Sequence, residues 1–197
     1  MKRTQPTASG LRERKRLETL HRIAKTSFRL FSTKGYEETT LDDISAAAGI
    51  SRRTFFHYFK SKDEILLAWQ TGVVASIRAA ILEETAEQPP IGALCNALMK
   101  LARRHSSDTS IALARLLKSS DQLRAANQAK YLLMEQAAFE SLCRLWPKRG
   151  QQERLRMVAI IGLAAFRSAV DGWTDEGGQQ PFPKYLEDTF ANLRSAL

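Results

Sequence analysis

Residues 34–62 read KGYEETTLDDISAAAGISRRTFFHYFKSK, and this stretch decides the fold. It opens with a short predicted helix that Thr40 can cap, with Asp42 and Asp43 in the first turn, where acidic side chains suit the positive end of the helix dipole. Gly49 then interrupts the apolar pattern, because glycine adopts the positive φ that a tight turn between helices often needs. A second helix follows this turn, so the stretch predicts a helix-turn-helix.

The second helix carries the side chains that would meet DNA. Ser51 is a good N-cap, and Phe55, Tyr58 and Phe59 recur at helical spacing and would hold the helix against a core. A recognition helix enters the major groove with its N-terminal residues on the base edges. Arg52 and Arg53 are therefore the predicted base readers, since arginine binds guanine O6 and N7 through two hydrogen bonds.

Two further side chains of this helix are predicted to support the contact. Thr54 can touch a phosphate or a thymine methyl group, and His57 lies one turn beyond Arg53 on the same exposed face, where it suits a phosphate.

The same stretch, with its flanks, resembles the DNA-binding domain of the TetR/AcrR-type transcriptional regulators over about residues 20 to 65. The matching residues are Leu30-Phe31, Gly35-Tyr36, Thr39-Thr40, Ile44-Ser45, Ala48-Gly49-Ile50-Ser51, Thr54-Phe55-Phe56-His57-Tyr58-Phe59 and Ser61-Lys62. Ser45 replaces the usual alanine. Phe56 stands where the family often has a tyrosine, so a hydroxyl contact to phosphate is lost or passes to His57 or Tyr58.

The resemblance also assigns phosphate contacts outside the base readers. Thr40, Ser51, Tyr58 and Lys62 match positions that contact phosphate in the family. Tyr58 can equally belong to the core, and Thr40 and Ser51 can serve as caps while also touching phosphate.

The charge is concentrated on this part of the chain. Residues 1–62 hold 14 Lys and Arg against 6 Asp and Glu, a net charge of +8, whereas residues 63–197 hold 16 against 15. A basic surface attracts the phosphate backbone independently of sequence. Arg12, Arg14, Lys15 and Arg16 would track that backbone or form a solvated helix start.

The rest of the chain also reads as helical, with no alternating β pattern. We expect an all-α protein of about nine helices: a disordered basic tail over 1–10, a helix-turn-helix DNA-binding domain over 11–60, and a helical bundle over 61–197. Pro89-Pro90, Pro147, Gly150 and Gly177-Gly178 mark breaks between helices. The helix that starts near Ser61 is expected to run to about Glu87, and a last helix to cover 184–197.

The resemblance implies that the bundle binds a small molecule and forms a homodimer through its last two long helices. Small residues recur in the stretch 158–173 and Leu155 supplies apolar surface, so we expect Leu155, Ala159, Gly162, Ala165 and Ala169 at the interface. The same residues would also suit a helix packed only within its own chain.

A largely apolar effector is expected, because the residues on the surrounding helices are mostly aliphatic and aromatic. The candidates are Trp69, Val73, Cys95, Leu98, Met99, Leu116, Met134, Ala138 and Phe166. Each of them could instead be ordinary core. Arg103, Arg104 and His105 could meet an acidic ligand, or could simply be solvated.

These observations predict a sequence-specific DNA-binding regulator, a repressor released from an inverted-repeat operator when the effector moves the helix beginning at Ser61. The alternatives are a ligand-independent DNA-binding or architectural factor, and an activator. The sequence offers no catalytic triad, phosphate loop or metal-spaced cluster, so we expect neither an enzyme nor a cofactor nor a metal site. No apolar run approaches 18 residues and the N-terminus lacks a secretory h-region. Cys95 and Cys143 fit reduced thiols in the cytoplasm.

Overall fold

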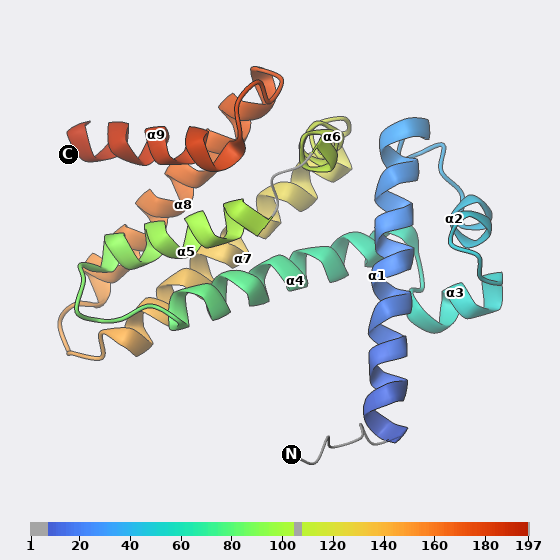
Figure 1. Cartoon of the computed structure of the whole chain (residues 1–197), viewed down its shortest axis with the longest axis horizontal. Helices are drawn as coiled ribbons and strands as arrows, with labels where there is room; N and C mark the ends of the chain where they lie inside the picture. Colours follow the sequence, from blue (N-terminus) through green and yellow to red (C-terminus); the bar gives the residue numbers. More distant parts are fainter. Residues whose placement is uncertain (1–7, 105–107, 197) are drawn as a thin grey trace, which may run out of the picture. The chain divides into compact units, whose positions relative to one another are not determined.

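The computed structural model describes residues 8–104 and 108–196 and confirms an all-α fold (Figure 1). Nine helices and no strands lie in these ranges. The helices are α1 (Ala8–Lys34), α2 (Leu41–Ala47), α3 (Arg52–Tyr58), α4 (Lys62–Leu82), α5 (Pro90–Arg104), α6 (Asp108–Leu116), α7 (Asp121–Leu145), α8 (Gln152–Asp175) and α9 (Phe182–Ala196). The chain divides into two compact units, 1–69 and 70–197.

The first unit is held together by aromatic and aliphatic side chains from each of its helices. α1 packs against α2, and α2 packs against α3. The fully or almost fully buried residues are Ile23, Phe31, Tyr36, Ile44, Phe55, Phe59, Ile65 and Leu66. Phe31 and Tyr36 meet edge to face with ring centroids 4.8 Å apart, a favoured arrangement for two aromatic rings. This core fixes the small helices α2 and α3 on the long α1.

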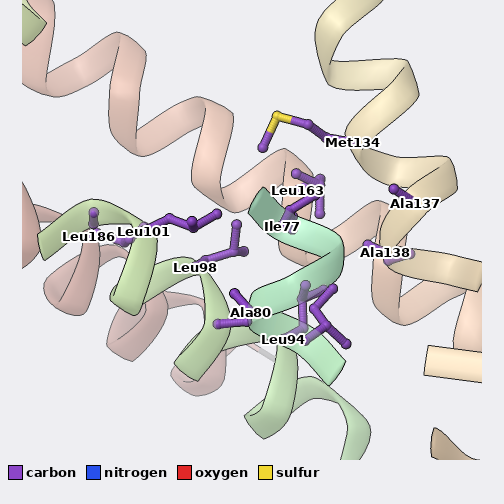
Figure 2. Close-up of a cluster of buried hydrophobic side chains, with 14 of the residues drawn as sticks. Ile77, Ala80, Leu94, Leu98, Leu101, Met134, Ala137, Ala138, Leu163 and Leu186 are labelled. Carbon is purple, nitrogen blue, oxygen red and sulfur yellow. The ribbon is translucent and has the colours of Figure 1, made fainter. Parts of the chain in front are cut away.

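The second unit has a continuous apolar core to which five helices contribute (Figure 2). α5 packs against α8 and α9, and α7 packs along α8. Figure 2 shows Leu94 and Leu98 of α5 beside Ile77 of α4, with Met134 of α7 and Leu163 of α8 directed toward them. One face of α5 is therefore buried in this core, with Cys95 and Met99 partly buried against it.

The structure changes the limits of three predicted segments. α1 begins at Ala8, within the stretch 1–10 that is expected to be disordered, and residues 1–7 lie outside the described ranges. The boundary expected at 60/61 lies one residue before the start of α4 at Lys62, and the two units divide at 69/70, within that helix. α9 begins at Phe182, two residues earlier than expected.

α4 ends at Leu82 instead of continuing to Glu87. Glu84, two residues after this end, contacts α5. Its carboxylate lies 2.6 Å from Lys100 Nζ of α5 and accepts hydrogen bonds from Gln88 (2.9 Å) and Asn96 (3.4 Å). These contacts hold residues 83–88 against α5 as a turn.

Lys130 of α7 is a lysine inside the second unit, with 7% of its surface exposed. Its ammonium lies 4.0 Å from the centroid of the Tyr131 ring. Burial lowers the pKa of Lys130 to about 7; the nearby Asp171 acts in the opposite direction and Arg167 in the same direction. The folded chain therefore gives up this proton at a lower pH than the unfolded chain, whose lysine has a pKa of about 10.4.

We expect this difference to make the protein more stable as the pH rises above 7. Between pH 7 and about 10.4 the unfolded state holds a proton that the folded state lacks, so the free energy of unfolding rises by up to about 1.4 kcal/mol per pH unit. Lys130→Met should remove that slope and stabilise the protein at pH 7. Urea unfolding at pH 7, 8 and 9 measures this, with the exposed Lys148→Met as the control. Equal slopes for wild type and Lys130→Met would contradict it.

Candidate DNA-binding surface and C-terminal groove

The two short helices of the first unit are capped as predicted. The Thr40 hydroxyl accepts a hydrogen bond from the Asp43 backbone N–H (3.1 Å), and the Asp43 carboxylate accepts one from the Thr40 backbone N–H (2.8 Å), which completes a capping box. Ser51 accepts from the Thr54 backbone N–H at 3.0 Å. Gly49 has a φ of +64°, so the turn requires the left-handed region that glycine adopts at little cost.

Polar contacts link this motif to the end of α1 and to the start of α4. Lys34 Nζ lies 2.6 Å from Asp43 Oδ2, and hydrogen bonds from Lys34 and Thr40 hold the pKa of Asp43 well below its usual range. Burial, with a hydrogen bond to Asp63, raises the pKa of Tyr36 above its usual value. Asp43 therefore stays ionised and Tyr36 stays neutral throughout the physiological range.

α3 has a buried face and an exposed face. Phe55 is fully buried, whereas Arg52, Arg53, Phe56 and His57 are exposed. Thr54 and Tyr58 are half-buried, and both line a shallow hollow with Arg53, Phe56 and His57. The structure thus brings together on one surface all five DNA-contact candidates of α3 itself, and Thr40 and Ser51 are exposed at the helix starts.

The two candidate base readers differ in their surroundings. Arg52 Nη1 lies 3.4 Å from Asp42 Oδ2, and the Arg52 guanidinium lies 5.8 Å from the centroid of the Phe56 ring. Arg53 forms no ion pair with any residue that the structure describes. An exposed ion pair such as Arg52–Asp42 is worth little in water, so Arg52 can exchange it for a base or a phosphate, while Arg53 is already available.

Lys62, which is expected to contact phosphate, also binds the backbone of its own chain. The Lys62 ammonium donates to the backbone carbonyl oxygens of Tyr36 (2.7 Å) and Glu37 (3.2 Å), and it lies 4.3 Å from the centroid of the Tyr36 ring. Only 23% of the side chain is exposed. These two hydrogen bonds tie the loop between α1 and α2 to the start of α4.

We expect Lys62→Met to lower the stability of the first unit by about 1–3 kcal/mol, because it leaves carbonyl groups without their charged donor. Operator affinity measured well below the melting temperature should change little. Thermal unfolding and fluorescence anisotropy with labelled DNA separate the two effects, and the exposed Lys60→Met is the matched control. Weaker DNA binding without a change in melting temperature would instead support a direct contact between Lys62 and phosphate.

Basic side chains at the start of α1 are only partly described. Lys15 and Arg16 are exposed, and the side chains of Arg12 and Arg14 lie outside the described residues.

A groove of about 450 Å³ lies in the second unit, between α5 and α9. It is lined by Glu84, by Cys95, Asn96, Met99, Lys100 and Arg103 of α5, and by Glu187, Phe190 and Arg194 of α9. Burial raises the pKa of the Cys95 thiol to about 11, against the influence of Arg194. Although burial of Glu84 works against it, hydrogen bonds from Lys100, Gln88 and Asn96 lower the pKa of its carboxyl group. We call this site the α5–α9 groove.

Most of the residues predicted to line a ligand pocket lie outside the α5–α9 groove. Met99 and Cys95 line the groove, whereas Leu98, Leu116, Met134 and Ala138 are buried core. Val73 and Phe166 are half-buried against that core. The side chains of Trp69 and Arg104, and the whole of His105, lie outside the described residues. The sequence reasoning missed Glu187, Phe190 and Arg194, whose only signal was their common face on the last helix.

The predicted interface on α8 also needs correction. Leu155, Ala159, Gly162 and Ala169 are buried within the chain itself, and only Ala165 is half-buried. A Cβ atom on Gly162 would lie 2.4 Å from Leu94 Cδ2, so this glycine permits the close approach of α5. The small residues serve intrachain packing. Met157 (51% exposed) and Ile160 (38%) point outward instead.

Two classes of feature are missing from the described ranges. They contain no cluster of three His, Cys, Asp or Glu side chains suited to a metal ion. None of their helices is, by itself, long and apolar enough to cross a membrane.

A capped helix-turn-helix with an exposed basic face, in one chain with a helical bundle, defines a DNA-binding regulator. Residues 23–69 match the family model for bacterial regulatory proteins of the tetR family, and residues 88–197 match the model for the MftR C-terminal domain. The chain belongs to the TetR/AcrR family of transcriptional regulators.

Individual proteins agree with this assignment. The HTH-type transcriptional regulator TcmR of Streptomyces glaucescens is 32% identical over 102 residues, which are 52% of this chain and 45% of TcmR. The chain thus spans less than half the length of that relative. The fold is similar to that of FadR from Bacillus subtilis, solved with stearoyl-CoA (TM-score 0.66, 16% identity, 90% of this chain and 98% of FadR). It is also similar to that of Thermus thermophilus FadR, a TetR-family repressor solved with lauroyl-CoA (TM-score 0.52, 24% identity, 87% and 91%).

Proposed function

We propose that this protein is a homodimeric repressor that binds an inverted-repeat operator and leaves it when a small effector binds to the second unit. The observation that carries the proposal is the exposed face of α3, where Arg53 stands without an ion pair among the described residues, in a chain whose two units both match regulator domains. Thermus thermophilus FadR, with a similar fold, is a repressor and holds lauroyl-CoA. The proposed site of action is the cytoplasm. Operator binding and release are binding equilibria, so the function needs no catalytic residue and no cofactor.

Binding-site selection from random DNA, followed by anisotropy titrations, tests operator binding. We expect two half-sites related by a two-fold axis and spaced by whole helical turns. Affinity should fall steeply as salt rises from 50 to 200 mM, roughly ten-thousandfold if 6–10 phosphates are contacted. A reporter gene downstream of the selected site should be silenced by the protein. A rise in reporter expression would identify an activator, and an affinity independent of salt would argue against operator binding.

The proposed dimer surface is the outward face of α8. Met157 and Ile160 lie on this face, with Arg156 and Arg167 beside them. Exposed apolar side chains rimmed by charged ones are typical of a surface that meets a second chain. This face replaces the buried set Ala159, Gly162 and Ala169 as the expected contact.

We expect Ile160→Lys to convert the dimer to monomers at micromolar concentration, because it places a charge in an apolar contact without a partner. Operator affinity should fall with it, since two half-sites are then bound independently. Sedimentation velocity measures the change. Leu82→Lys is a matched control, because Leu82 has the same 38% exposure but lies at the end of α4. A variant that remains dimeric would place the interface elsewhere.

The proposed switch uses α4, which begins in the first unit and ends in the second. An effector can shift the equilibrium only by its different affinity for the two states of the protein. Linkage then requires operator DNA to weaken effector binding by the same factor. Equal effector affinity with and without operator would show that the compound is not an inducer, and would favour the ligand-independent alternative.

A further inference from the structure

The α5–α9 groove combines an apolar floor with charged walls. Met99 and Phe190 face it from the two helices, and Phe190 is only 2% exposed. α5 and α9 pack against each other, and Figure 1 shows them running alongside one another within the bundle. The groove volume of about 450 Å³ lies within the usual range for small-molecule sites, about 300–1,000 Å³.

One cation of the groove is already neutralised. Lys100 Nζ lies 2.6 Å from Glu84 and 3.6 Å from Glu83. The Glu84 carboxylate also accepts hydrogen bonds from Gln88 and Asn96. This network leaves no positive charge of Lys100 free for a ligand.

Two other cations remain available. Arg103 and Arg194 line the groove, are exposed, and form no ion pair with any residue whose side chain the structure describes. The remaining acid, Glu187, lies 3.9 Å from Lys184, which is itself outside the groove lining. The groove therefore offers two guanidinium groups beside an apolar floor, and arginine binds carboxylate or phosphate through paired hydrogen bonds.

We propose that the α5–α9 groove is the effector site and that the effector is an amphipathic anion, whose carboxylate or phosphate is bound by Arg103 and Arg194 and whose apolar part lies over Met99 and Phe190. This inference rests on the proposed function. It refines the largely apolar effector expected from the sequence, because the apolar candidates Leu98, Leu116 and Met134 are closed inside the core.

Isothermal titration with four probes that share a ten-carbon chain tests the chemistry of the groove. The probes are decanoate, decyl phosphate, decanol and decyltrimethylammonium, each below its micelle concentration. We expect the two anions to bind at least tenfold more tightly than the alcohol, and the ammonium compound to bind most weakly. Equal affinity for the anionic and cationic probes would overturn the proposal.

Two sets of variants locate the binding. Arg103→Gln/Arg194→Gln should lose the preference for the anions, and Met99→Gln should weaken all four probes. Arg154→Gln is the control, because Arg154 is an exposed arginine of α8 outside the groove. A loss of anion affinity as large in the control as in the double variant would reject the groove as the site.

A separate titration of decanoate into the operator complex tests the effector role. Release of DNA by wild type but not by the double variant supports it. If decanoate binds in the groove but operator affinity does not change, the effector role is refuted, and the proposal of operator binding is unaffected. Failure to bind any selected DNA would refute the proposed function, whereas probe binding by the free protein still reports on the groove.

Discussion

Arg53→Glu is expected to lower operator affinity by about a hundredfold or more. The substitution removes a guanidinium that can bind guanine through two hydrogen bonds, worth about 1–3 kcal/mol, and it adds a carboxylate that phosphates repel. The fold should be unchanged, because Arg53 is exposed and forms no ion pair within the described part of the chain. Anisotropy titrations against the selected operator measure the loss, and circular dichroism checks the fold.

Arg154→Glu, with the same charge change on α8, is the control and should bind DNA almost normally. The milder Arg53→Ala should broaden the selected consensus at one position of each half-site. An unchanged consensus for Arg53→Ala and Arg52→Ala would remove both arginines from the set of base readers.

Phe55→Ala should destabilise the first unit by about 3–5 kcal/mol, the usual cost of emptying a buried phenylalanine site. Phe55 is 0% exposed, and its ring centroid lies 6.0 Å from that of Phe59. A typical domain has only about 5–15 kcal/mol of stability, so α3 should lose its fixed position and operator binding should disappear. Chemical unfolding followed by circular dichroism measures the change.

The neighbouring Phe56 provides a control of the same residue type. It is 45% exposed, so Phe56→Ala should cost little stability and act on DNA binding alone. If both variants unfolded at the same denaturant concentration, the assignment of the two faces of α3 would be wrong.

Local rules were enough to predict the helix-turn-helix. Caps such as Thr40 and Ser51 and the turn at Gly49 depend on residues within four positions of each other, and the structure has each of them in place. The buried face of α3 followed from the spacing of Phe55 and Phe59. These features are decided by backbone conformation and helical period, which the sequence displays directly.

The same local rules could not predict which residues, distant in the sequence, contact each other in the fold. The groove joins Met99 to Phe190 across more than ninety positions, so no local pattern links them. A row of small residues indicates close packing but does not identify the helix that packs there. Gly162 faces Leu94 of its own chain. Likewise a lysine next to a DNA-binding motif looks like a phosphate contact, while the partners of Lys62 lie 25 and 26 residues earlier.

The division of α5 into two faces has a consequence for how such regulators diverge. Leu94, Leu98 and Leu101 hold the fold, whereas Met99 and Arg103, on the same helix, line the groove. Arg103 is exposed and Met99 is only partly buried against that core, so substitutions at these two positions should cost less stability than substitutions at the three leucines. Gene duplicates of this protein could therefore acquire new inducers in few mutational steps while keeping their ancestral operators. Such mutations would change the compound that the regulator responds to before they change the genes that it controls.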